Sequence, residues 1–337
     1  MKHAVLVKTG GPDSIQIQET EKPAPANKEI TIKVDHAGVA FADVMMRHGI
    51  YPGAPKMPFT PGYDVCGSIS EIGSGVSGFS IGEKVIALTQ FGGYAQYASV
   101  HYKRAIKVPD NINTAEAVTL VLNHISAYQM LTKYKKLRPG NTVLIHSAAG
   151  GVGTAATQIA RSMGLKTYGT CSTSKINIVK NLGATPIDYK KEDFVTRTRE
   201  LEPQGVDFVL DPIGGEHWVQ SRKVLKSQGT LVGFGFFSLF DHDRPIGSFM
   251  DAGRIILSLM IKTWIPGLKK FHLYSIQPKN HKAVQKSLRE VLEMYNNGDI
   301  KPIIGKEYKL NEVSKAHEEL ANSKAHGKLI LNCKDPA

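Results

Sequence analysis

A glycine-rich turn in the middle of the chain has the residue types that bind a dinucleotide. Residues 146–153 read HSAAGGVG, and they follow a short apolar run and precede a helical pattern. Glycines let the backbone approach a pyrophosphate, and the first turn of the helix supplies free N–H groups and a positive dipole end. Ala148 replaces the first glycine of the usual GxGxxG pattern. The identification of the motif therefore depends largely on the predicted strand before it and the predicted helix after it. The predicted pyrophosphate contacts are Ala149, Gly150, Gly151, Val152 and Gly153.

The residues after the next predicted strand indicate which dinucleotide binds. Enzymes that use NAD place Asp or Glu about 20 residues beyond the glycines. Here residues 169–175 read GTCSTSK, and no Asp or Glu occurs from residue 117 to residue 187. Ser172, Thr173 and Lys175 can donate hydrogen bonds to a 2′-phosphate, and Lys175 adds positive charge. The sequence therefore predicts NADP(H), with a merely solvated Lys175 as the alternative.

Alternating strands and helices must position these residues. Between residues 142 and 234, five strand patterns alternate with helical ones, which indicates parallel βαβ units in a doubly wound sheet. Before residue 108, short β-rich runs separated by Gly and Pro indicate a barrel-like β unit. We expect an α/β protein. Further predicted elements are a helix at 115–134, an apolar helical stretch at 236–268, a strand at 271–275, a helix at 281–295 and a strand at 327–332.

Composition excludes several classes of function. The net charge is +12, but the basic residues are spread thinly and their short runs contain few aromatics, so we expect no nucleic acid partner. Cys66, Cys171 and Cys333 lie far apart without metal-ligand spacing, which favours free thiols and a cytoplasmic location. No run of 18 apolar residues occurs, so a membrane span is not expected.

Several motifs give the whole chain a resemblance to the medium-chain dehydrogenase/reductase superfamily. Residues 41–51, FADVMMRHGIY, resemble its quinone oxidoreductase and zeta-crystallin branch. DPIGG at 211–215 and YNNGDIKP at 295–302 resemble the vesicle amine transport protein-like group. The more general markers are PG at 61–62, GSISEIG at 67–73, GFSIGEKV at 78–85, GGYAQY at 92–97, the glycine turn and GK at 327–328.

The resemblance implies a fold with two domains. A GroES-like β-barrel catalytic domain would occupy residues 1–122 and be completed by residues 278–337. A Rossmann NADP-binding domain with a doubly wound parallel sheet would occupy residues 123–277, with the apolar insertion near 236–268. In the family, an edge strand near 270–275 pairs with a second subunit, so we expect a homodimer, because an exposed apolar strand is a liability unless it is paired.

The resemblance also implies zinc-free chemistry. The Cys and His that bind catalytic zinc in other members fall at Ala40 and Tyr63, and neither side chain is a good zinc ligand. We therefore expect no metal, and hydride transfer to a quinone or an α,β-unsaturated carbonyl acceptor, which needs less Lewis-acid help. Tyr51, Tyr63, Asp43 and His124 are the candidate catalytic residues. Alternatively, the tyrosines line the pocket, Asp43 braces a helix start and His124 is a core histidine.

Further cofactor contacts come from the resemblance alone. Tyr189 would stack near the adenine, while Ser126 and Phe234 would approach the ribose and nicotinamide. Backbone groups of Phe271 and Leu273 would meet the carboxamide. Gly233 and Lys328 complete the implied set.

A second interpretation of the chain is a carrier or adaptor. Such a protein would keep the nucleotide site without turnover and act through the apolar surface of residues 236–268. Membrane contact belongs to this interpretation, and we expect the enzyme instead.

Overall fold

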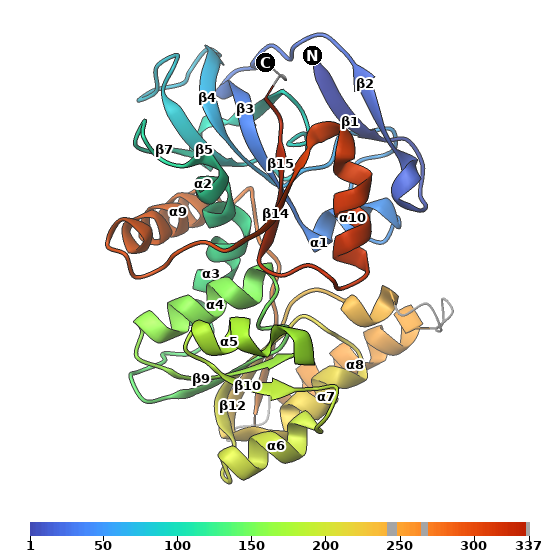
Figure 1. The fold of residues 1–337 in the computed structure, drawn as a ribbon, viewed down its shortest axis with the longest axis vertical. Helices are drawn as coiled ribbons and strands as arrows, with labels where there is room; N and C mark the ends of the chain where they lie inside the picture. Colours follow the sequence, from blue (N-terminus) through green and yellow to red (C-terminus); the bar gives the residue numbers. More distant parts are fainter. Residues whose placement is uncertain (241–247, 264–268, 335–337) are drawn as a thin grey trace. The chain divides into compact units, whose positions relative to one another are not determined.

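The computed structural model describes residues 1–240, 248–263 and 269–334 of the chain. The chain divides into two compact units (Figure 1). The first unit comprises residues 1–125 and 277–337, and the second comprises residues 126–276. The sequence placed these boundaries at residues 122/123 and 277/278.

The first unit is built on a seven-stranded sheet with the order β14-β15-β3-β4-β5-β7, in which β6 also pairs with β3. Its strands are β3 (Glu29–Val39), β4 (Asp64–Ile72), β5 (Lys84–Leu88), β6 (Tyr97–His101), β7 (Ala105–Lys107), β14 (Ile304–Lys309) and β15 (Lys328–Asn332). In β3, Lys33 is exposed between buried Ile32 and Val34, while most of the strand is buried. β15 pairs antiparallel with β3, so the C-terminal tail adds a strand to the N-terminal sheet (Figure 1). β1 (Lys2–Leu6) and β2 (Ile15–Glu19) form a separate antiparallel pair.

Helices of the first unit are α1 (Phe41–Arg47), α2 (Thr114–Thr119), α9 (His281–Asn296) and α10 (Val313–Ala321). The single helix expected at 115–134 is interrupted: α2 is followed by a π-helical turn, Leu120–His124, and then by α3 (Ile125–Lys133). Two side chains account for the turn. Asp64 accepts a hydrogen bond from the Leu122 N–H at 3.2 Å, and His124 Nδ1 lies 2.9 Å from the Thr119 carbonyl oxygen. Side-chain groups inserted in this way displace the regular helical ladder.

The second unit is a six-stranded parallel sheet with the order β10-β9-β8-β11-β12-β13. Its strands are β8 (Thr142–Ile145), β9 (Lys166–Cys171), β10 (Thr185–Asp188), β11 (Val206–Asp211), β12 (Leu225–Gly233) and β13 (Lys270–Leu273), and its helices include α4 (Gly151–Ser162), α5 (Ile176–Asn181), α6 (Phe194–Leu201) and α7 (Glu216–Lys223). Strand order reverses between β8 and β11, which is where a doubly wound sheet binds dinucleotides. The α/β fold with a Rossmann sheet is thus as predicted.

Part of the apolar stretch at 236–268 lies outside the described residues. Within it, α8 (Ser248–Thr263) packs Leu259 into the core of the sheet, where Phe271 of β13 also lies. The opposite face of α8 exposes Leu257, Met260 and Ile261. Among the described residues, no helix has both the length and the apolar character needed to cross a bilayer.

Candidate functional site

The backbone conformation of the glycine turn after β8 requires small residues. Ser147 adopts a left-handed conformation, with φ of 54°, and the Ala148 N–H is anchored to the Thr170 carbonyl at 2.9 Å. A Cβ on Gly153 would lie 2.2 Å from the Ser147 carbonyl oxygen, so this position must be glycine. α4 begins at Gly151, and the first N–H groups of a helix have no acceptor within it. The turn therefore presents a helix N-terminus with close backbone access, which fits a pyrophosphate.

Hydroxyl groups and a lysine follow β9, where a 2′-phosphate would bind. Ser172 is the N-cap of a short 3-10 turn, Thr173–Lys175. Tyr189 follows β10 and is half-exposed, and burial together with the neighbouring acidic groups raises the pKa of its phenol. Sequence reasoning missed one acid: Asp188 Oδ2 accepts a hydrogen bond from Thr173 Oγ1 at 2.6 Å.

Both carboxylate oxygens of Asp188 accept hydrogen bonds from neighbouring residues. Oδ2 accepts from Thr173, and Oδ1 accepts from the Lys190 N–H at 3.1 Å. Asp188 is also buried. The Thr173 hydroxyl donates a hydrogen bond to Asp188, and the Ser172 hydroxyl lies 3.3 Å from that of Ser174.

Three of the other predicted cofactor residues of this unit, Gly233, Phe234 and Leu273, lie at the carboxyl ends of β12 and β13. Phe234 follows β12, and its N–H bonds to the Asp211 carbonyl at 3.0 Å. Gly233 pairs with Leu273, and a Cβ on Gly233 would lie 2.7 Å from the Trp218 ring. The Phe271 side chain belongs to the core, so only its backbone can contact a ligand. Ser126 is buried at the start of α3.

Lys328 lies in the first unit, where it forms a buried ion pair. Its Nζ lies 3.2 and 3.0 Å from the two carboxylate oxygens of Asp64. Lys328 is 3% exposed and Asp64 is fully buried. This pairing gives Lys328 a structural role that the resemblance did not reveal.

Two of the four candidate catalytic residues contact each other. The Tyr51 and Tyr63 hydroxyls form a short hydrogen bond, and their rings meet edge to face with centroids 6.1 Å apart. Tyr63 is 1% exposed, whereas Tyr51 is partly exposed. Burial raises the pKa of Tyr51, so its phenol stays protonated near neutral pH and can donate a hydrogen bond.

Asp43 lies beside this pair but is fully occupied. Its Oδ2 accepts from the Ala40 N–H and the Tyr94 hydroxyl, each at 2.9 Å, and its Oδ1 accepts from the Gly62 N–H at 3.1 Å. Complete burial raises the pKa of Asp43 to about 6, although these hydrogen bonds oppose the rise. The carboxylate therefore ties together the two backbone segments that carry Ala40 and Tyr63.

His124 is buried in the π-helical turn. Its Nδ1 bonds to a carbonyl oxygen, which requires a proton on Nδ1 and leaves Nε2 as an acceptor. Nε2 is buried without a partner in the described structure. Burial lowers the pKa of His124 to about 4, so the ring is neutral at pH 7 and can accept a hydrogen bond there but is a poor proton donor.

Metal ligands do not gather at the positions that the resemblance suggested. Ala40 is the N-cap residue of α1, and the Tyr63 hydroxyl is bonded to Tyr51. Among the described residues, the His, Cys, Asp and Glu side chains that converge closely enough to hold an ion are His146, Asp211 and His217 in the second unit.

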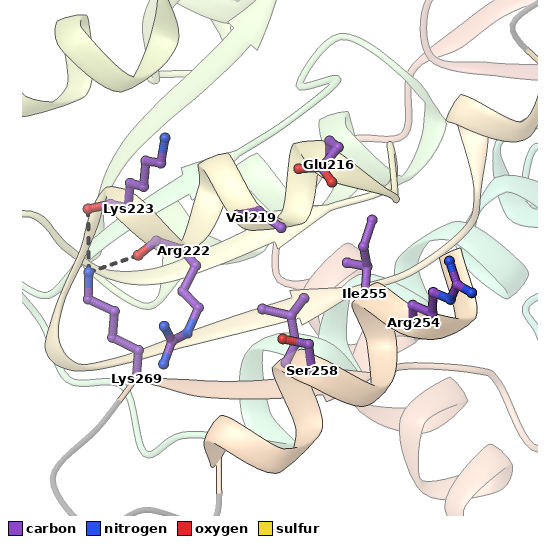
Figure 2. Close-up of a pocket in the computed structure, with 9 residues that line it drawn as sticks. Glu216, Val219, Arg222, Lys223, Arg254, Ile255, Ser258 and Lys269 are labelled. Carbon is purple, nitrogen blue, oxygen red and sulfur yellow. Dashed lines mark hydrogen bonds between the residues drawn. The ribbon is translucent and has the colours of Figure 1, made fainter. Parts of the chain in front are cut away.

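A separate pocket lies between α7 and α8, and Figure 2 shows several of its lining residues. Lys269 Nζ donates to the Arg222 and Lys223 carbonyl oxygens at 2.8 and 3.4 Å. The amine therefore caps the C-terminus of α7, where a cation is favoured by the helix dipole. Arg254 lies apart from Lys269 along this pocket (Figure 2).

Known proteins resemble this chain in both sequence and fold. Residues 26–110 match the alcohol dehydrogenase GroES-like domain, and residues 182–331 match the zinc-binding dehydrogenase model. The synaptic vesicle membrane protein VAT-1 homolog of Rattus norvegicus is 33% identical over 97% of this chain and 83% of its own length.

Two solved structures are similar over nearly the whole chain. The Escherichia coli quinone oxidoreductase complexed with NADPH has a TM-score of 0.85 and 26% identity, covering 98% of this chain and 100% of its own. The CurK enoyl reductase has a TM-score of 0.84 and 25% identity, covering 98% of each chain. The chain therefore belongs to the medium-chain dehydrogenase/reductase superfamily, in the quinone oxidoreductase branch that includes the VAT-1 homologues.

Proposed function

We propose that the protein is an NADPH-dependent, zinc-free oxidoreductase that reduces a quinone or an α,β-unsaturated carbonyl compound. The observation that carries this proposal is the glycine turn after β8 together with the Ser172–Lys175 turn after β9. The first can receive a pyrophosphate, and the second offers hydroxyls and a cation to a 2′-phosphate. Relatives named as a quinone oxidoreductase with NADPH and as an enoyl reductase support the same chemistry.

The residues of the second unit bind and orient the cofactor. NADPH, when bound, supplies a hydride, and the protein's task is to position the acceptor against it. The α4 N-terminus would hold the pyrophosphate, and Lys175 would contribute a charge-assisted hydrogen bond to the 2′-phosphate. Tyr189 would lie near the adenine.

In the first unit, Tyr51 is the side chain we propose to meet the acceptor oxygen. Its phenol is protonated and partly accessible, whereas Tyr63 is buried behind the shared hydrogen bond. Tyr63 would orient Tyr51, and Asp43 would hold both strands of backbone in place. A conjugated acceptor needs modest polarisation, so a phenol can suffice where other members use zinc.

The second unit also has a surface suited to a homodimer. β13 is an edge strand of the six-stranded sheet, and Leu273 at its end is 42% exposed. The exposed face of α8 carries Leu257 and Met260 beside this strand. We propose that a second copy of the chain covers this edge, because unpaired apolar strand edges are prone to aggregate.

The exposed face of α8 also supports the second candidate function. A carrier without turnover would use Leu257, Met260 and Ile261 to meet another apolar surface. The VAT-1 homolog of Rattus norvegicus is named a synaptic vesicle membrane protein, which agrees with that candidate. The cytoplasmic location remains a prediction.

A screen of NADPH consumption separates the two functions. We expect oxidation of NADPH with quinones or enones, slower oxidation with simple aldehydes, and no change after treatment with a chelator. Elemental analysis should find well under one zinc per chain. Tight NADPH binding with no turnover on any acceptor would favour the carrier.

A further inference from the structure

A buried cluster at the point where strand order reverses is not used by the proposed reaction. Asp211 ends β11 and is fully buried. Its Oδ2 accepts hydrogen bonds from Ser221 Oγ at 2.6 Å and from His217 Nδ1 at 2.7 Å, and its Oδ1 accepts from the Ile213 N–H at 2.8 Å. Burial would raise the pKa of Asp211, but these hydrogen bonds and nearby imidazoles bring it below its ordinary value, so the group is an acceptor only.

The direction of every proton in this cluster follows from that carboxylate. The Ser221 hydroxyl donates its hydrogen bond to Asp211. Toward His146 Nε2, which lies 3.0 Å away, the Ser221 oxygen can therefore only accept a hydrogen bond. His146 Nε2 therefore carries the ring proton, since burial lowers the pKa of His146 to about 3 and keeps the ring neutral. Nδ1 is then the acceptor for the Thr170 hydroxyl at 3.0 Å.

The chain of hydrogen bonds ends at the dinucleotide turn. Because the Thr170 hydroxyl donates a hydrogen bond to His146, its Oγ1 is free to accept one from the Ser147 N–H, at 3.3 Å. Ser147 is the left-handed residue that opens the turn, and its carbonyl oxygen approaches Gly153. Asp211 on β11 and the turn after β8 are thereby connected through α7 and β9.

We propose that Asp211, Ser221, His146 and Thr170 are positioning residues for the cofactor pyrophosphate, acting through the Ser147 N–H. The proposal rests on the proposed use of NADPH and adds residues to which neither the family resemblance nor the sequence motifs assigned a role. The buried chain fixes the orientation of the turn before the cofactor arrives, so less ordering is needed on binding.

A transition metal is the competing explanation for the same side chains. His146, Asp211 and His217 each offer one ligand atom, these atoms lie within 4.8 Å of one another, and imidazole and carboxylate groups suit such ions. An ion bound to Nε2 would displace its proton and impose the opposite tautomer. The Ser221 hydroxyl already bridges His146 and Asp211, which favours the proton chain.

The tautomer of His146 is the first test and needs no variant. Nitrogen-15 NMR of the full-length protein should show His146 as the neutral Nε2–H form, unchanged by EDTA. A proton on Nδ1, or a stoichiometric divalent ion whose removal changes the tautomer, would overturn the proposal.

Binding of two ligands provides the second test. In Ser221→Ala, the dissociation constant for NADPH should rise about tenfold, the scale of losing a buried hydrogen bond to a charged group. Adenosine 2′-monophosphate, which lacks the pyrophosphate, should bind within twofold of wild type. Ser162→Ala is the matched control, because its hydroxyl donates to the Ile159 carbonyl near the C-terminal end of α4, away from the turn.

If Ser221→Ala does not fold, two variants of Thr170 test the same proposal. Thr170→Ser keeps the hydroxyl and should bind NADPH like wild type, while Thr170→Val removes it and should lose affinity. Equal weakening of NADPH and adenosine 2′-monophosphate, or no weakening of either, would refute positioning. If wild type binds no NADPH at all, the proposed function fails instead.

Discussion

At the scale of single residues, the two tyrosines are unequal although the sequence presents them alike. Tyr63 is enclosed, and its hydroxyl is directed at Tyr51. Tyr51 is partly exposed. The distinction follows from burial, which depends on contacts between distant segments.

Replacing each tyrosine by phenylalanine should therefore have different effects. Tyr63→Phe keeps the ring and should reduce turnover by less than about tenfold. Tyr51→Phe removes the proposed oxyanion donor and should cost on the order of 10²-fold, as such donors commonly do. Turnover with one quinone and one enone measures both. A loss far above tenfold in Tyr63→Phe, with NADPH affinity intact, would show that the buried phenol takes a direct part.

Lys175 tests the choice of cofactor. Lys175→Ala should weaken NADPH binding by about 1–3 kcal/mol, the scale of a charge-assisted hydrogen bond, and leave NADH binding nearly unchanged. Titration of both cofactors against the variant measures this. Lys180→Ala, an exposed lysine of α5, removes the same charge and should affect neither. Equal losses for NADPH and NADH would remove the 2′-phosphate assignment.

Asp188 shows what the residue pattern could not supply. It is the first acid after residue 117, and it follows the predicted strand directly. Only the pairing of β10 with β9 brings it beside Thr173. A contact across two strands has no signature in local spacing, so the phosphate site was predicted without its acidic neighbour.

At the scale of elements, the glycine turn depends on close approach at Gly153. Gly153→Ala would force a Cβ to 2.2 Å from the Ser147 oxygen, so the turn must open. We expect NADPH affinity to fall by more than about tenfold, since the backbone can no longer follow the pyrophosphate. Gly253→Ala is the control, because a Cβ there meets nothing within 4 Å. Unchanged NADPH affinity in Gly153→Ala would contradict the assignment of this turn.

Elements with a regular spacing of apolar residues could be predicted from the sequence. Elements whose geometry depends on side chains from distant parts of the sequence could not. The βαβ units follow from apolar strands alternating with helical patterns, and each was found close to its expected place. The π-helical turn was not predicted, because it depends on Asp64 from another strand. β14 and α10 were also missed, although α10 buries Val313, Ala316 and His317 at helical spacing.

At the scale of the whole molecule, buried histidines make stability depend on pH, and three of them have strongly lowered pKa values. Burial lowers the pKa of His124 to about 4 and those of His146 and His317 to about 3. Below pH 6.5 the unfolded chain binds protons that the folded chain excludes, so stability falls as the pH falls toward 4. Asp43 has the opposite effect on stability: because its folded-state pKa is raised, its contribution becomes more favourable as the pH falls from 6 to 4.

Urea unfolding at pH 7 and pH 5 measures this dependence. Each buried histidine that stays neutral should lower the free energy of unfolding by about 2 kcal/mol between pH 7 and pH 5. The wild-type protein should therefore be clearly less stable at pH 5. His317→Gln removes one such group and should show a smaller drop between the two pH values. Equal stability of wild type at both pH values would mean that the buried histidines are charged or open to water.

Hydride transfer from NADPH to a conjugated acceptor is the reaction we propose for this chain. The most direct measurement is the mass of the product after incubation with 2-cyclohexen-1-one and NADPH that carries deuterium at the transferring C4 position. We expect the saturated ketone with one deuterium on the carbon β to the carbonyl, formed at the same rate after treatment with a chelator. Saturated product without deuterium, or no product while NADPH binds tightly, would contradict the account.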